Sequence, residues 1–172
     1  MADASVRPAA PNDADAIARL LLDHWIMSPV ASVTEYVASL DAADVARSWS
    51  DAITAPPSRR HLTLVACAGP RPVGFLAAAP SDADGDVEVL ELVVAPGHRR
   101  QGHGSRLLRA WADLSLESMA TGGVVWIGAA DDAARQFLNG AGWAPDGSSR
   151  ALDTGPDLMR QVRLATTLTL VR

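Results

Sequence analysis

Residues 94–105 read Val94-Ala95-Pro96-Gly97-His98-Arg99-Arg100-Gln101-Gly102-His103-Gly104-Ser105, and they are the most informative part of this chain. An apolar, β-branched run over 87–94 leads into this stretch, and an amphipathic run begins at its end. The order is therefore strand, turn, glycine loop and helix. The two loop glycines have no Cβ, so a ligand can approach the backbone closely. Because N–H groups and peptide dipoles converge at a helix N-terminus, the loop predicts a pyrophosphate site.

The spacing of this loop excludes two commoner phosphate loops. A P-loop requires G-x-x-x-x-G-K-[ST], and this chain contains no lysine. A dinucleotide-binding turn requires G-x-G-x-x-G, whereas the chain has Arg99-x-x-Gly102-x-Gly104. The alternative is a glycine-rich turn without a ligand, and the clustered arginines argue against it.

This R-x-x-G-x-G loop, preceded by V-x-P and followed by Leu107-Leu108, resembles the acetyl-CoA signature of the GNAT superfamily of N-acetyltransferases. A second stretch, 127–143, is similar to the family pattern N-x-x-A-x-x-x-Y-x-x-x-G-F when Ala134 and Gly142 are aligned. The resemblance implies acetyl-CoA as co-substrate. It also implies direct transfer of the acetyl group to a primary amine, within a ternary complex.

The resemblance also implies which residues hold the coenzyme. The strand end would pair with the pantetheine arm, and the loop would hold the pyrophosphate, with the arginines adding charge-assisted contacts. The alternative for at least one arginine is a solvated basic turn. Asp131 stands where the family commonly has Asn. The implied cofactor-binding residues are Leu92, Val93, Val94, Arg99, Arg100, Gln101, Gly102, His103, Gly104, Ser105 and Asp131.

Two carboxylates on the strand before the loop are the candidate catalytic residues. A primary amine is only about 0.1% neutral at pH 7, so some group must take its proton. Glu88 matches a position where several relatives keep a base, and Glu91 lies nearer the thioester. We favour Glu88 as the base. Their odd spacing puts the two on opposite faces of a regular strand, unless a bulge lies between them. The alternative is a pair of solvent-exposed carboxylates.

Leu138 stands where the family usually has a tyrosine that protonates the departing thiolate. Leucine has no proton to give, so water, Ser115 or Ser148 would have to serve, or turnover would be poor. A second hypothesis is therefore an acyl-CoA-binding or regulatory module with little turnover. A third is transfer of a longer acyl group.

The family resemblance places acceptor recognition on the first two helices and the last hairpin. Aromatic and acidic side chains there could bind a cationic amine, although core aromatics beside a solvated acidic face are the favoured interpretation. The acceptor would be a small-molecule amine or a peptide amine. These side chains are Trp25, Glu35, Tyr36, Asp41, Asp44 and Trp49.

Composition bounds the remaining possibilities. The 172 residues are 48% hydrophobic and 20% charged, which suits one soluble domain over 1–172. A net charge of −5 argues against nucleic-acid binding. The single Cys67 and the histidine spacing predict no disulfide and no metal site. No signal peptide or membrane span is evident, so we expect a cytoplasmic protein, with a homodimer possible.

Hydrophobic periodicity predicts the order of the elements. Helices are expected at 13–25, over 34–53 with a possible interruption, from Ser105 to a stop at Thr121-Gly122-Gly123, and at 131–141. Strands are expected at 5–9, 61–68, 73–79, 87–94, 124–128, 150–153 and 161–170. This order predicts an α/β (α+β) protein with the single-domain GNAT fold, in which about four helices flank a mixed sheet of six to seven strands.

Overall fold

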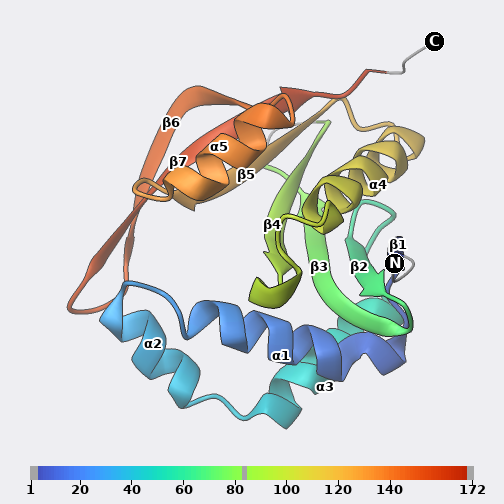
Figure 1. The fold of residues 1–172 in the computed structure, drawn as a ribbon. Coiled ribbons are helices and arrows are strands. Elements are labelled where there is room, and N and C mark those ends of the chain that lie inside the picture. The colour runs from blue at the N-terminus through green and yellow to red at the C-terminus, as the bar shows by residue number, and fades with distance from the viewer. Residues whose placement is uncertain (1–3, 83–84, 170–172) are drawn as a thin grey trace.

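The computed structural model describes residues 4–82 and 85–169. Within them the chain forms seven strands, five α-helices and two short 3-10 helices (Figure 1). The elements are β1 (Ala4–Pro8), η1 (Pro11–Asp13), α1 (Ala14–Trp25), α2 (Ala31–Ala38), α3 (Ala42–Thr54), β2 (Leu62–Ala68), β3 (Arg71–Pro80), β4 (Asp86–Val94), η2 (Pro96–His98), α4 (His103–Glu117), β5 (Gly122–Gly128), α5 (Asp132–Gly140), β6 (Ala144–Asp153) and β7 (Leu158–Thr167).

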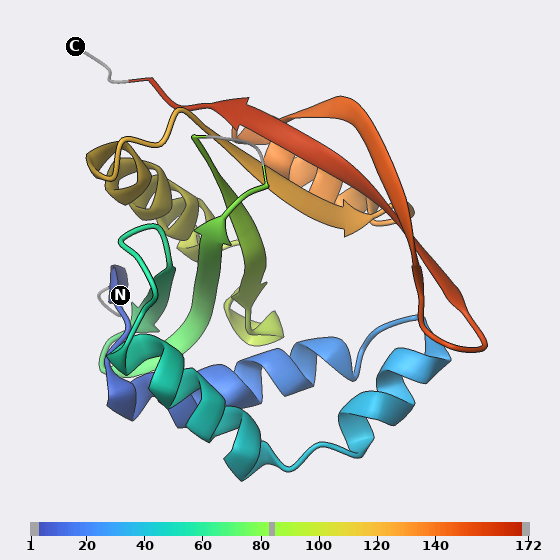
Figure 2. The same ribbon diagram turned by 180° about the vertical axis from the view of Figure 1, so that it is seen from behind.

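All seven strands form one mixed sheet in the order β1-β2-β3-β4-β5-β7-β6. Only β4 and β5 run parallel, and the other neighbours are antiparallel. α4 and α5 cover one face of the sheet, and α1 and α3 lie on the other (Figures 1 and 2). The predicted α/β architecture is confirmed. The last strand ends at Thr167, and the predicted end at Leu170 lies outside the described residues.

The segment predicted as one helical region over 34–53 is two helices, which brings the number of α-helices to five. α2 ends at Ala38, and Asp41 starts α3 by accepting a hydrogen bond from the backbone N–H of Ala43 at 2.8 Å. Aspartate is a favoured N-cap residue because its carboxylate satisfies a free N–H of the first turn. The break lets α2 turn away from α3 (Figure 2).

Two hydrophobic cores lie on opposite faces of the sheet. The larger one packs α4 and α5 onto β3, β4 and β5, and its largest buried side chains include Trp111, Leu107, Leu76 and Leu164. The smaller one packs α1 and α3 onto β2, β3 and β4 through Ile17, Leu21, Phe75 and Val93, with Trp49 against it.

An ion pair fixes the start of α1 against the sheet. Asp13 is 4% exposed and accepts hydrogen bonds from both terminal nitrogens of Arg7, at 2.6 and 2.9 Å. It also accepts from the backbone N–H of Ala10 at 2.8 Å. The hydrogen bonds from Arg7 are the main cause of a pKa of Asp13 below its usual value. This contact anchors the start of α1 to the end of β1.

α4 ends earlier than its glycine-based prediction. The helix stops at Glu117, Met119 takes a left-handed φ of 63°, and Ala120 donates its N–H to the carbonyl of Ser115. Gly122 and Gly123 are the first, buried residues of β5 and not a helix stop. Packing explains the glycine at 123, because a Cβ there would overlap the ring of Trp111.

We therefore expect Gly123→Ala to destabilise the protein by about 1–3 kcal/mol, the usual cost of overpacking a core. Urea unfolding followed by circular dichroism measures the change. Gly140→Ala is the matched control, because nothing lies within 4 Å of a Cβ at that helical position. The control should be neutral or more stable by about 0.4–1 kcal/mol. Equal stability of Gly123→Ala and the unsubstituted protein would contradict the packing account.

Candidate functional site

β4 is paired on both sides along only part of its length. Residues 86–89 pair with 122–125 of β5, whereas 90–94 have no partner on that side among the described strands. The remainder of β5 pairs with β7 alone. Figure 1 shows the two strands diverging from this point. Backbone groups of alternate residues point to the same edge, and the N–H of Ala95 donates to Val73 of β3, so the groups of Val93 face β3 and those of Leu92 and Val94 face the free side. The carbonyl of Val94 accepts from Arg99. The N–H groups of Leu92 and Val94 and the carbonyl of Leu92 therefore remain for an extended, amide-bearing ligand.

A β-bulge lies at Leu90. Val89 pairs with Ala78 and Glu91 with Ala77, so Leu90 has no partner on β3 and is 54% exposed. An extra residue changes the alternation of side chains along the strand. As a result, Glu88 (opposite Ala79) and Glu91 lie on the same face, the one that α1 covers. For a regular strand the sequence predicts that Glu88 and Glu91 lie on opposite faces, and the bulge places them on one face instead.

The two carboxylates have different surroundings. Burial raises the pKa of Glu91 to about 7, and a hydrogen bond from the side chain of Trp25 at the end of α1 offsets part of that rise. Glu88 is partly exposed and lies beside Val124 of β5, within the paired part of the sheet. Glu91 therefore lies just where β4 separates from β5, with a pKa suited to proton transfer near neutral pH.

The glycine loop has the predicted geometry. Gly102 is the N-cap of α4 with φ +81°, a left-handed conformation that glycine adopts without strain. The first bond along the helix runs from the N–H of Arg106 to the carbonyl of Gly102, at 3.1 Å. The N–H groups of His103, Gly104 and Ser105 therefore belong to the first turn, where no intrahelical acceptor exists. A cluster of such donors at the positive end of a helix attracts an anion.

Arginine and glutamine side chains brace this loop. Arg99 donates from Nε to the carbonyl of Val94 at 3.1 Å, and Gln101 donates to that of Gly97 at 3.2 Å. Arg106, which the sequence analysis did not single out, donates to the carbonyl of Gln101 at 3.0 Å. The exposed Arg100 takes a positive φ of 63°. The basic residues therefore shape the turn as well as placing positive charge beside it.

His103 supports the loop from inside the protein. Its side chain is 2% exposed, and its ring lies 6.1 Å from that of His98. Burial, followed by the positive charge of Arg106 and the neighbouring His98, lowers the pKa of His103. A ligand in the loop can therefore meet His103 only through the backbone.

Charged groups from three elements meet near the loop. Asp131, the predicted N-cap, accepts a hydrogen bond from the N–H of Ala134 at 2.9 Å and so starts α5. His24, on the last turn of α1, lies within electrostatic range of both Arg99 and Asp131. Burial, and then the charge of Arg99, lower the pKa of His24, and the charge of Asp131 opposes that shift. The sequence contains no signal for His24 at this place, because only the fold brings the end of α1 to the loop.

The structure separates the side chains predicted for acceptor recognition. Trp25 reaches Glu91 and belongs to the site. Trp49 packs edge-on against Phe75 at 5.4 Å and is a core residue. Asp41 caps α3, and Asp44 pairs with the exposed Arg47. Glu35 and Tyr36 are exposed on α2. The acidic side chains are thus solvent-exposed, as the favoured interpretation expected, but only Trp49 of the three aromatic residues is a core residue.

Leu138, at the position of the family tyrosine, is 3% exposed and lies within the larger core. Ser115 is fully buried near the C-terminal end of α4, and the glycine loop lies at the other end of that helix. Ser148 lies in the irregular part of β6 beside Asp146. Ser115 is therefore the wrong candidate for the acid, because a fully buried hydroxyl cannot reach a ligand.

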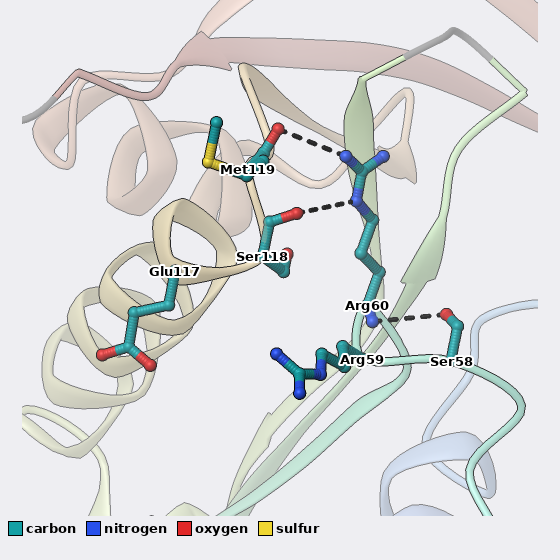
Figure 3. A pocket seen from close by; sticks show the side chains of 6 residues that line it. All are labelled: Ser58, Arg59, Arg60, Glu117, Ser118 and Met119. Carbon is teal, nitrogen blue, oxygen red and sulfur yellow. Dashed lines mark hydrogen bonds between the residues drawn. The ribbon is translucent and has the colours of Figure 1, made fainter.

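A hollow of about 330 Å³ lies at the C-terminal end of α4, away from the glycine loop (Figure 3). Arg60 crosses it and donates to the carbonyls of Ser118 and Met119, at 3.4 and 3.2 Å. These are carbonyls beyond the end of the helix, where a cation is favoured. The hollow thus contains a structural contact between α4 and the segment before β2.

Solved structures with the same arrangement are known. yncA from Salmonella typhimurium, solved with its cofactor acetyl-CoA, has a TM-score of 0.76 and 16% identity over 99% of this chain and 96% of that one. Ribosomal-protein-alanine N-acetyltransferase from Brucella melitensis has a TM-score of 0.75 and 16% identity, over 95% of this chain and 99% of that one. The paia N-acetyltransferase from Thermoplasma acidophilum, solved with coenzyme A, has a TM-score of 0.74 and 13% identity, over 96% of this chain and 99% of that one. At these identities the likeness establishes the fold.

The sequence matches the profile of the Acetyltransferase (GNAT) family over residues 22–143. Because the match covers more than half of the chain, the protein belongs to this family. No curated protein sequence matches the chain. In the described part of the chain, none of the helices combines the length and apolar character needed to cross a membrane.

The environment of Glu91 predicts its titration. In ¹³C NMR the carboxylate should titrate near pH 7, and Trp25→Phe should raise that pKa further because the ionised form loses a donor. Folding raises the pKa of Glu91, so the folded protein binds the proton more tightly than the unfolded chain does. The contribution of Glu91 to the free energy of unfolding is therefore fully present below the unfolded pKa of 4.5 and is lost as pH rises through about 7. Glu91→Gln should therefore gain stability relative to the unsubstituted protein over that range. A Glu91 pKa near 4.5 would contradict this environment.

Proposed function

We propose that this protein transfers an acetyl group from acetyl-CoA to a primary amine. The supporting observation is the unpaired edge of β4 at Leu92–Val94 leading directly into the N-terminus of α4. The coenzyme has a matching order of parts, with an amide-bearing arm followed by a pyrophosphate. Acetyl-CoA and coenzyme A are also the ligands named for two similar structures.

The residues at the site fit the coenzyme in shape and charge. The N–H groups at 103–105 lie in the first turn of α4, and Arg99 and Arg100 add positive charge. A Cβ at Gly102 would lie 2.8 Å from Nη1 of Arg106, and one at Gly104 would lie 3.1 Å from the ring of Phe137. Larger residues would therefore crowd the place where a pyrophosphate would contact backbone. Asp131 would then shape the site by starting α5 beside the loop.

Glu91 is the proposed general base. The coenzyme supplies an activated thioester, the amine nitrogen forms the new bond to its carbonyl carbon, and the carbon–sulfur bond breaks. Glu91 takes the proton that the amine loses, directly or through a water, and Trp25 holds the carboxylate in place. This choice reverses the preference for Glu88 from sequence, because Glu91 lies where the strands separate and has the suitable pKa.

Solvent is the proposed source of the proton for the departing thiolate. Leu138 has no hydroxyl and is buried, and Ser115 is enclosed in the core. A thiolate with an ordinary pKa of about 8.5 is a fair leaving group without a positioned acid. The same observation favours the second candidate, a coenzyme-binding module with little turnover, and release of free thiol in the presence of amines distinguishes the two.

Gly102→Ala should weaken coenzyme A binding by about tenfold or more, because alanine is strained by about 1–3 kcal/mol at a positive φ and the free loop would relieve this strain by leaving the binding conformation. Isothermal titration calorimetry with coenzyme A measures the change. Gly97→Ala is the control, because a Cβ there meets nothing within 4 Å and its φ is not positive. Unchanged affinity in Gly102→Ala would contradict the role of the loop.

Glu91→Gln should lower kcat by about 10²-fold or more, the usual contribution of a general base. Its affinity for coenzyme A should stay unchanged. In the unsubstituted enzyme kcat/KM should rise with pH through about 7 as Glu91 ionises, and the variant should lose this step. Glu88→Gln serves as the comparison and should change kcat far less. A large loss in Glu88→Gln with normal rates in Glu91→Gln would reverse the assignment.

A further inference from the structure

Two arginines lie over the exposed side of one tryptophan on the β5-β7-β6 part of the sheet. Cζ of Arg150 on β6 lies 4.2 Å from the centre of the Trp126 ring, and Cζ of Arg163 on β7 lies 5.6 Å from it. Trp126 itself is partly exposed. Guanidinium groups stack on indole rings and are held flat against them. We call Trp126, Arg150 and Arg163 the arginine–tryptophan cluster.

The arginine–tryptophan cluster lies on the same face of the sheet as the proposed base. Glu88 pairs with Val124 in the parallel register, and Trp126 follows two residues later, so Trp126 shares the face of Glu88 and Glu91. Helix α5 covers the opposite face, and Figure 2 shows this part of the sheet from the side away from α5. The cluster therefore lies on the far side of the separation between β4 and β5 from Glu91, on the face where an acceptor would approach.

The two arginines differ in how their charge is already used. Arg163 donates from Nε to the carboxylate of Asp146 at 2.7 Å, so its charge is balanced. Arg150 donates from Nε to the neutral side-chain oxygen of Gln161 at 2.7 Å. Gln161 thus orients Arg150 without neutralising it. An oriented guanidinium offers a fork of donors that matches a carboxylate or a phosphate.

The outer side of this surface is closed by α2. Ser32 donates from Oγ to the hydroxyl of Thr154 at 2.9 Å and to the carboxylate of Asp157 at 3.1 Å, and its N–H donates to the same carboxylate. These bonds tie α2 to the turn between β6 and β7 (Figure 2). Because α2 bounds the surface on this side, we expect a small acceptor and not a protein chain.

We propose that the acceptor is a small amine that carries an anionic group a few bonds from its nitrogen, and that Arg150 binds that group. This inference rests on the proposed function, since it assigns the amine end of the acceptor to Glu91. Paired strands lie about 4.8 Å apart, and β4 and β5 diverge here, so the guanidinium lies beyond about 5 Å from the carboxylate. An α-amino acid or a short phosphorylated amine carries an amine and an anionic group in one small molecule.

The experiment compares matched pairs of acceptors. Common L-amino acids are each tested against the amine that lacks the carboxylate, such as tyrosine against tyramine, and phosphoethanolamine is tested against ethanolamine. A peptide with a free N-terminus and an amidated C-terminus represents protein acceptors. The anionic members should have the higher kcat/KM. Arg150→Gln should reduce kcat/KM for them by about tenfold or more, the usual effect of losing a charge-assisted contact, and should leave their neutral partners nearly unchanged.

Arg160→Gln is the matched control, because Arg160 pairs with Ala151 and so lies on the opposite face of the same hairpin. It should not alter the preference. Equal use of neutral and anionic partners, a preference for the amidated peptide, or an unchanged preference in Arg150→Gln would each overturn the proposal. Thermal unfolding of both variants shows whether Arg150 only braces the hairpin.

Binding measurements separate this inference from the proposed function. N-acetylated amino acids and N-acetylated amines are titrated into protein saturated with coenzyme A, and no turnover is needed. Tighter binding of the carboxylates, lost in Arg150→Gln, supports the anion site even if no amine is acetylated, and in that case only the transfer reaction would be contradicted. Equal binding of both kinds of compound would overturn the anion site.

Discussion

In a regular antiparallel pair, side chains alternate strictly between the two faces of the sheet, and every residue has a partner. Leu90 interrupts this pattern in β4, and the pairing of β4 with β5 ends one residue earlier, at Val89. The rest of the site depends on this break. It leaves the edge of 92–94 unpaired, it places Glu88 and Glu91 on one face, and it opens the sheet beside the N-terminus of α4.

Burial, helix ends and hydrogen bonds to the backbone determine the electrostatics around this opening. Burial raises the pKa of Glu91 to about 7, and one hydrogen bond from Trp25 opposes that rise. On the coenzyme side, positive potential comes from the end of α4 and from arginines whose nitrogens also bind loop carbonyls. The contact between Arg7 and Asp13 anchors the start of the helix that carries Trp25 and His24, and packing of Ile17 and Leu21 holds that helix on the sheet. The site is therefore preorganised before any ligand arrives.

Local patterns were sufficient to predict the order of elements, the glycine loop and the N-cap Asp131, since each is encoded by neighbouring residues. The break between α2 and α3 and the early end of α4 were harder to predict. Asp41 and Met119 act there through single caps, and Gly122-Gly123 resembles a helix stop. Features that depend on long-range register could not be derived. These include the bulge that brings Glu88 and Glu91 together, His24 beside the loop, and Arg150 over Trp126.

Amide hydrogen exchange with and without coenzyme A tests the central claim directly, because that claim assigns backbone groups to the ligand. Coenzyme A should slow exchange at the N–H groups of Leu92 and Val94, which lie on the free edge of β4, and in the first turn of α4, 103–105. Exchange in the paired half of β4, 86–89, should change little. Unchanged exchange at both the strand edge and the helix end, at saturating coenzyme A, would contradict the account.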